Sequence, residues 1–110
     1  MSVVLHITFD NPKNLDINEV FPITSLKIFD TVPGLQWKIW GLSDEKVLTG
    51  IYLFNSHKAA EAYLKEASPY LSNLGYENIK GVYYNVHTYL SRGTKGPIDA
   101  PANPAHEEQL

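Results

Sequence analysis

The chain of 110 residues contains no cysteine. This absence excludes disulfide bonds, thiolate nucleophiles and thiolate metal ligands, and it fits a reducing compartment. No apolar run reaches the ~20 residues that a membrane-spanning helix needs. No basic segment followed by a small-residue cleavage site marks the first residues either. We therefore expect a cytoplasmic protein without a membrane partner.

An excess of positive charge is also missing. Nine Lys and Arg residues are outnumbered by twelve Asp and Glu residues, which gives a formal net charge of −3. Nucleic-acid binding usually needs a basic stripe that displaces counterions, and here the basic residues are scattered. RNA-binding modules have a βαββαβ order of elements, which this sequence also predicts. The excess of acidic residues nevertheless argues against a nucleic-acid partner.

Sequence motifs for common cofactors are absent as well. The chain has no glycine-rich phosphate loop and no nucleophile elbow. Its histidines, at positions 6, 57, 87 and 106, show none of the spacings that bind metal ions. We expect neither a metal ion nor an organic cofactor.

The residues that are present predict one domain with one modest core. Apolar alternation and turn residues predict the secondary structure. Strands are expected at 2–9, 35–42, 47–54 and 79–90, and helices within 15–32 and over 55–68, with a further turn or two over 69–75. Proline interrupts both helices. At Pro22, either a short turn ends at Phe21 and the main helix begins there, or one helix kinks.

This βαββαβ order predicts an α+β protomer of the ferredoxin-like type, with a four-stranded antiparallel sheet and both helices on one face. The other face also carries large apolar groups, which predicts a contact surface. A homodimer that packs two such faces together would form a dimeric α+β barrel. We assign this domain to residues 1–91 and expect an extended or disordered tail over residues 92–110.

Several short segments then resemble a known family. They are "LHITF" at 5–9, "PGLQWKIW" at 33–40, "TGIYLF" at 49–54, "AYL" at 62–64 and "NLG" at 73–75. Together they resemble the YdhR-type family of small mono-oxygenases, in the dimeric α+β barrel superfamily, over residues 3 to about 91. The resemblance implies a homodimer and kinship with cofactor-independent oxygenases that act on polycyclic aromatic compounds. The chain departs from the family pattern at Pro22 and in the tail.

Two tryptophans and two histidines are the first candidate site residues. Trp37 and Trp40 stand three apart on a strand and should point to opposite faces, where they serve packing or a stacking wall for an aromatic ligand. His6 lies mid-strand among apolar residues and is either a catalytic base or a core histidine bonded to backbone or tyrosine. His87 is a second candidate, because the first and last strands are neighbours in this fold.

Tyrosines complete the candidate set. Tyr52, Tyr63 and Tyr84 could donate hydrogen bonds to a substrate oxyanion. We interpret His6 and Tyr52 as catalytic, and assign substrate binding to Trp37, Trp40, Tyr63, Tyr84 and His87. Lys38 is either an electrostatic partner or a solvated lysine.

The pocket is expected between helices and sheet, and the predicted function is cofactor-independent oxygenation of a hydrophobic aromatic molecule. The alternative is a non-catalytic, ligand-binding or regulatory homodimer that uses the same cavity.

Overall fold

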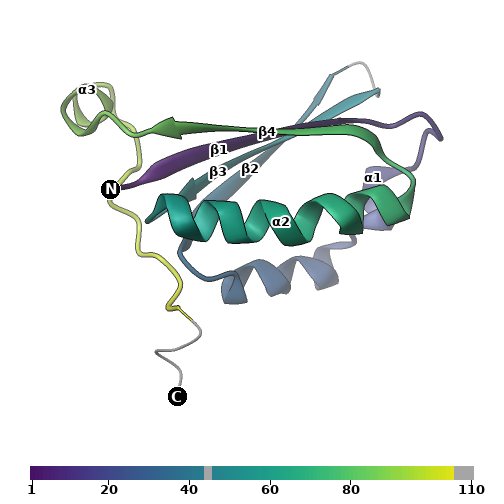
Figure 1. The fold of residues 1–110 in the computed structure, drawn as a ribbon, viewed down its shortest axis with the longest axis horizontal. Helices are drawn as coiled ribbons and strands as arrows, with labels where there is room; N and C mark the ends of the chain where they lie inside the picture. Colours follow the sequence, from purple (N-terminus) through teal and green to yellow (C-terminus); the bar gives the residue numbers. More distant parts are fainter. Residues whose placement is uncertain (44–45, 106–110) are drawn as a thin grey trace.

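The computed structural model describes residues 1–43 and 46–105. Part of the predicted hairpin loop, the end of the predicted tail and His106 lie outside these residues. The fold is α+β, as predicted, with the strands β1 (Val3–Asp10), β2 (Leu35–Ser43), β3 (Val47–Phe54) and β4 (Glu77–Asn85) in one antiparallel sheet. The strand order is β2-β3-β1-β4, which is consistent with the ferredoxin-like arrangement (Figure 1).

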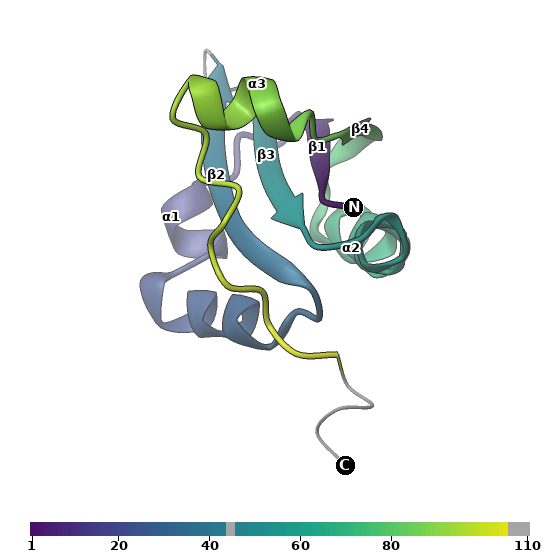
Figure 2. The same cartoon turned by 90° about the vertical axis from the view of Figure 1, so that its left-hand side faces the viewer.

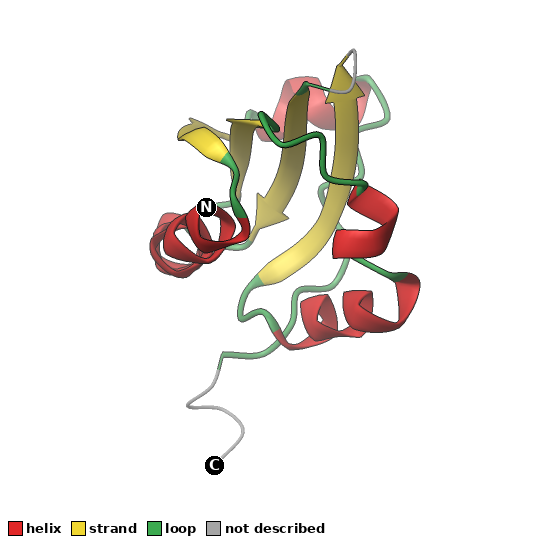
Figure 3. Cartoon of the chain, turned by 90° about the vertical axis from the view of Figure 1, so that its right-hand side faces the viewer, coloured by secondary structure: helices red, strands yellow, loops and turns green. Residues whose placement is uncertain are grey.

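Alternation along β1 divides the sheet into two faces. Val3, Leu5, Ile7 and Phe9 are buried, whereas the residues between them are only partly buried. The helix α2 (His57–Leu74) covers the buried side, and the short α1 (Ile17–Val20) and the 3₁₀ helix η1 (Ile23–Thr31) cover the same side over β2 and β3 (Figure 3). We call this side the helix face and the opposite side the outer face.

Helix α2 is one continuous helix with clear start and stop signals. The Ser56 side chain accepts a hydrogen bond from the Ala59 N–H, and Gly75 closes the helix in the left-handed conformation at φ 107°. The predicted break at Pro69 is wrong. Pro69 lies inside the helix with an exposed side chain, so the packing of Ala67 and Leu71 against the core outweighs the lost backbone hydrogen bond.

The segment before β2 follows the first of the two alternatives for Pro22. Helix α1 ends at Val20 with Phe21 as its C-cap, and Pro22 precedes the next helical segment. That segment, η1, is a 3₁₀ helix and contains no buried residue. Within Ile23–Thr31, only Phe29 packs against the buried core. Helix η1 itself is therefore held by few apolar contacts.

The end of β4 corrects another prediction. We expected the last strand to reach residue 90, but β4 ends at Asn85 and a short helix, α3 (Thr88–Gly93), follows. The His87 Nδ1 accepts the Leu90 N–H at 3.2 Å and so caps α3. Residues 94–105 then pass from α3 towards the edge strand β2 (Figure 2). The division into a domain over 1–91 and a tail over 92–110 stays a prediction.

A register irregularity in β2 decides which side chains reach the helix face. Leu35 pairs with Phe54, but Trp37 pairs with Leu53, so one extra residue stands between them. Strict alternation along 35–42 would place Leu35 on the face of Trp37, and the extra residue reverses this. Leu35 lies on the helix face with Lys38 and Trp40, and Trp37 lies on the outer face.

Candidate active site under the 3₁₀ helix

A connected group of aromatic rings fills the space between the sheet and the α1–η1 segment. Trp40 of β2 lies 5.1 Å from Phe21 and 6.0 Å from Phe29, centroid to centroid. Phe29 in turn lies 6.5 Å from Tyr63 of α2. The group reaches Tyr52 of β3, whose ring is 4.9 Å from that of Tyr63. Rings from four separate elements thus form one apolar wall, which we call the aromatic cage.

The Lys38 amine lies inside this cage. Its Nζ atom is 3.3 Å from the centroid of the Trp40 ring, 4.4 Å from that of Phe29 and 4.6 Å from that of Tyr52. Among the described residues, no carboxylate forms an ion pair with Lys38. The ring faces attract the ammonium form by ~0.5–2 kcal/mol. Burial acts in the opposite direction and dominates, lowering the pKa of Lys38 from 10.5 to about 7. Near neutral pH, a substantial fraction of this amine is therefore neutral.

Two tyrosine hydroxyls meet beside the amine. The hydroxyl oxygens of Tyr52 and Tyr63 are 3.1 Å apart and share a hydrogen bond. Burial raises the pKa of both phenols, so both stay protonated at neutral pH. Gly50 makes room for the Tyr52 ring, because a Cβ at Gly50 would come within 2.8 Å of it. The pair is therefore a source of O–H donors on the helix face.

His6 and Trp37 lie on the other side of the sheet. The His6 imidazole contacts the Thr49 hydroxyl, which donates to the Ile7 carbonyl at 3.1 Å. The Trp37 indole N–H donates to the Pro97 carbonyl at 2.9 Å. We expected both residues to line the pocket between helices and sheet, and their placement there is wrong. Within one chain, the sheet separates them from Tyr52 and Tyr63.

The remaining predicted site residues also lie apart from the cage. Tyr84 is on the outer face, and 54% of its surface is exposed. His87 was expected to approach His6, but it lies five positions beyond Val82, the residue that pairs with His6. The structure therefore brings together Trp40, Tyr52 and Tyr63 of the predicted set. The catalytic and binding roles of all these residues stay predictions.

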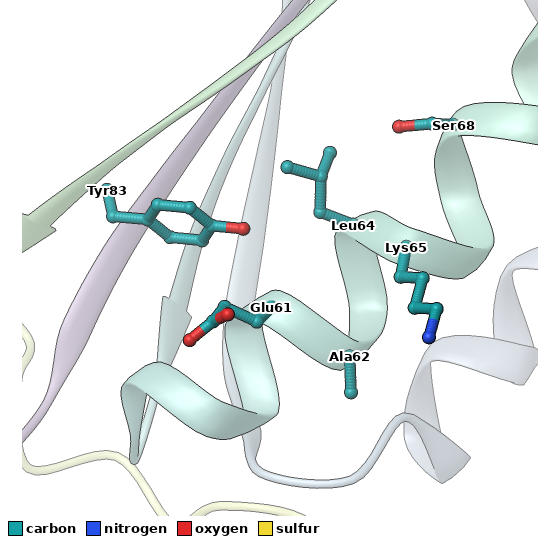
Figure 4. A pocket seen from close by; sticks show the side chains of 6 residues that line it. All are labelled: Glu61, Ala62, Leu64, Lys65, Ser68 and Tyr83. Carbon is teal, nitrogen blue, oxygen red and sulfur yellow. The ribbon is translucent and has the colours of Figure 1, made fainter.

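Two surface pockets lie away from the aromatic cage. One, of about 360 Å³, lies between α2 and β4, where Tyr83 points towards Glu61 and Leu64 (Figure 4). The other, of about 500 Å³, lies at the turn after β1 around Asn11 and Pro12. Neither of these two pockets is lined by Lys38 or Tyr52.

No group of three or more His, Cys, Asp or Glu side chains in residues 1–43 and 46–105 is arranged to hold a metal ion. No helix in the described part of the chain is long and apolar enough to cross a membrane.

These features define an α+β protein in which a partly buried amine and a tyrosine pair lie between the antiparallel sheet and its helices. The model of the family described as "Putative mono-oxygenase ydhR" matches residues 3–97. The chain belongs to this family, and the resemblance seen in the sequence is thereby confirmed. A comparison with curated proteins finds no match.

Sequence reasoning undervalued Lys38 and missed Phe21 and Phe29. One signal was available, because the alternation in "QWKIW" places Lys38 on the same face as Trp40. That face becomes the helix face only through the irregularity between Leu35 and Trp37. Phe29 follows a helical spacing after Pro22 that predicts contact with the sheet, but neither Phe29 nor Phe21 carried a signal for a site.

The burial of Lys38 predicts a specific dependence of stability on pH. The folded pKa of about 7 lies below the unfolded value of 10.5. Between these values the unfolded chain binds more protons, so stability rises with pH. The full cost, on the order of 5 kcal/mol, applies below about pH 7. Urea unfolding should show a free energy of unfolding that rises from pH 7 to 9.5 in the wild type and rises much less in Lys38→Met.

Lys65→Met is the matched control, because Lys65 is exposed on α2. It should keep the wild-type slope between pH 7 and 9.5. Equal slopes for the wild type and Lys38→Met would show that Lys38 titrates as a solvated lysine.

Proposed function

We propose that this protein is a cofactor-independent mono-oxygenase that acts on a hydrophobic aromatic small molecule within a homodimer. The observation that carries the proposal is the Lys38 amine in a cage of aromatic rings beside the Tyr52–Tyr63 hydroxyl pair. Membership of the mono-oxygenase family supports the reaction class. The cage supports the substrate class, because flat rings are the natural partners of an aromatic wall.

The reaction that we propose draws its electrons from the substrate. A base removes a proton from an activated CH₂ or phenol group, and the resulting anion transfers one electron to O₂. The two radicals couple to form a peroxide, and its O–O bond then breaks. One oxygen atom stays on the substrate as a carbonyl and the other leaves as water, so a CH₂ group and O₂ become a C=O group and H₂O.

Lys38 and the tyrosine pair would divide the work of this reaction. The neutral Lys38 amine accepts the substrate proton, because its pKa of about 7 suits proton transfer near neutrality. Tyr52, whose pKa is raised by burial, keeps its proton and donates a hydrogen bond to the substrate oxyanion. Tyr63 orients the Tyr52 hydroxyl, and Trp40 and Phe29 stack against the substrate. The α1–η1 segment excludes water and must shift to admit a ligand.

The outer face supports the homodimer. By register, Ile39, Ile51, His6 and Val82 form one row across all four strands. Ile39 and Val82 are 54% and 46% exposed in the single chain. A second copy that covers this row would remove a large apolar patch from water. His6, Trp37 and Tyr84 then belong to or border the interface, while Tyr52 and Tyr63 serve the pocket.

A non-catalytic ligand-binding or regulatory homodimer is the second candidate. The observation in its favour is that the aromatic wall and the Tyr52–Tyr63 hydroxyl pair suit binding of an aromatic ligand whether or not a reaction follows. In this function a bound aromatic molecule would displace Phe29 and shift η1, and no oxygen would be consumed.

Oxygen uptake separates the two functions. We expect the pure protein to consume O₂ with a polycyclic phenol or an anthrone-type ketone in a Clark electrode at pH 7.5. Lys38→Arg should lose ~10²–10⁴-fold in rate, because a guanidinium group cannot accept the proton. Tyr52→Phe should lose ~10²–10³-fold through the missing oxyanion donor.

Tyr70→Phe is the matched control, because Tyr70 is 56% exposed on α2. It should retain full uptake, and calorimetry should show that every variant is folded. Binding of the phenol without oxygen uptake would favour the second function. Loss of oxygen uptake in His6→Ala, with full oxygen uptake in Lys38→Arg, would identify His6 and not Lys38 as the base.

Light scattering tests the proposed dimer. The wild type should elute at about twice the chain mass of 12.4 kDa at micromolar concentration. Val82→Asp places a charge within the apolar row of the outer face, on the edge strand β4, and should give monomers. Ile28→Asp, at a 66% exposed position on η1, should leave the dimer intact. A wild type that is monomeric at these concentrations contradicts the dimer.

A further inference from the structure

The end of η1 has few attachments of its own. The Val32 N–H reaches the Phe29 carbonyl at 3.4 Å, and the Leu35 N–H reaches the Val32 carbonyl at 3.3 Å. Both hydrogen bonds are long. The last carbonyls of a helix need partners from outside the helix. Phe29 is at the same time the one residue of η1 that packs on the core.

Asn103 supplies those partners from the other end of the chain. Its side-chain Nδ2 donates to the Phe29 carbonyl at 2.8 Å and to the Val32 carbonyl at 2.9 Å. One amide group thus makes the two shorter bonds to the end of η1. Both donors of this amide are used, and both acceptors belong to the segment that covers the cage.

The Asn103 backbone is itself fixed on the edge strand. Its N–H donates to the Leu35 carbonyl at 2.9 Å, and its carbonyl accepts the Gly34 N–H at 3.0 Å. Upstream, the Gln36 side chain donates to the carbonyls of Ile98 and Ala100 at 3.1 and 2.6 Å. Residues 97–105 therefore form a strap that ties the start of β2 to the end of η1 (Figure 2).

The strap lies almost entirely beyond the family match, which ends at residue 97. Ile98, Ala100 and Asn103 are therefore outside the part of the chain that the family model describes. The fastening of η1 is an addition to the matched domain, and it acts on the residue whose ring lies 4.4 Å from the Lys38 amine.

We propose that Asn103 is a positioning residue, which holds Phe29 over Lys38 and so keeps the aromatic cage closed. Releasing the two carbonyls lets η1 tilt away from β2 and admits water to the Lys38 amine. The strap thereby sets how dry the cage is, and its release is the movement that opens the cage to a ligand. This role concerns the environment of Lys38 and does not depend on turnover.

The test follows Lys38 by NMR in the full chain, with ¹³C-labelled lysine and assignment through Lys38→Arg. In the wild type the Lys38 Cε signal should titrate near pH 7. In Asn103→Asp, a carboxylate replaces the donor amide and faces two carbonyls, so the titration should move up by at least ~1 pH unit. Asn103→Ala should move it in the same direction.

Two further variants keep the result interpretable. Asn73→Ala, at an exposed position of α2, should leave the Lys38 titration unchanged. A chain that ends at Pro97 removes most of the strap and should shift the titration as Asn103→Ala does. If Asn103→Ala and Asn103→Asp lower the melting temperature but leave the Lys38 midpoint at the wild-type value, the strap is only structural and the proposal is wrong.

Discussion

The placement of one amine among aromatic rings is the constraint on which the account of this protein depends. Lysine is rarely buried, because the loss of hydration is expensive. Here the Lys38 Nζ lies against the faces of Trp40, Phe29 and Tyr52, which come from three different elements. Such a site forms only when β2, β3 and η1 are all in place. Burial of the Lys38 amine therefore lowers the free energy of unfolding near neutral pH.

The two faces of the sheet carry different features, a candidate site on one and an apolar surface on the other. The helix face holds the amine and the tyrosine pair, and its wall is aromatic. The outer face carries the apolar row through Ile51 and the His6–Thr49 contact, and the proposed homodimer would cover it. The strap over residues 97–105 is hydrogen-bonded to the start of β2 and to the end of η1, which is part of the helical cover on the helix face.

Much of the fold could be predicted from the sequence, because alternation in β1 and β3 and the caps of α2 are local signals. The errors came from effects that local patterns do not contain. Core packing carries α2 through Pro69, and one extra residue in β2 moves Leu35 to the other face. The site was predicted in part. Tyr52 and Tyr63 were both among the predicted site residues, whereas the cage also depends on Phe29, which reaches Lys38 only through tertiary packing. His6 looked buried because β1 is central, but alternation alone could not say which face would be covered.

A crystal structure of the protein with a bound polycyclic phenol tests the central claim most directly. The account predicts ligand density between η1 and the sheet, with the phenolic oxygen within hydrogen-bond distance of Lys38 or Tyr52 and with the Phe29 ring displaced. Density on the outer face against His6 and Trp37, with the Lys38 cage closed and unchanged, would contradict it.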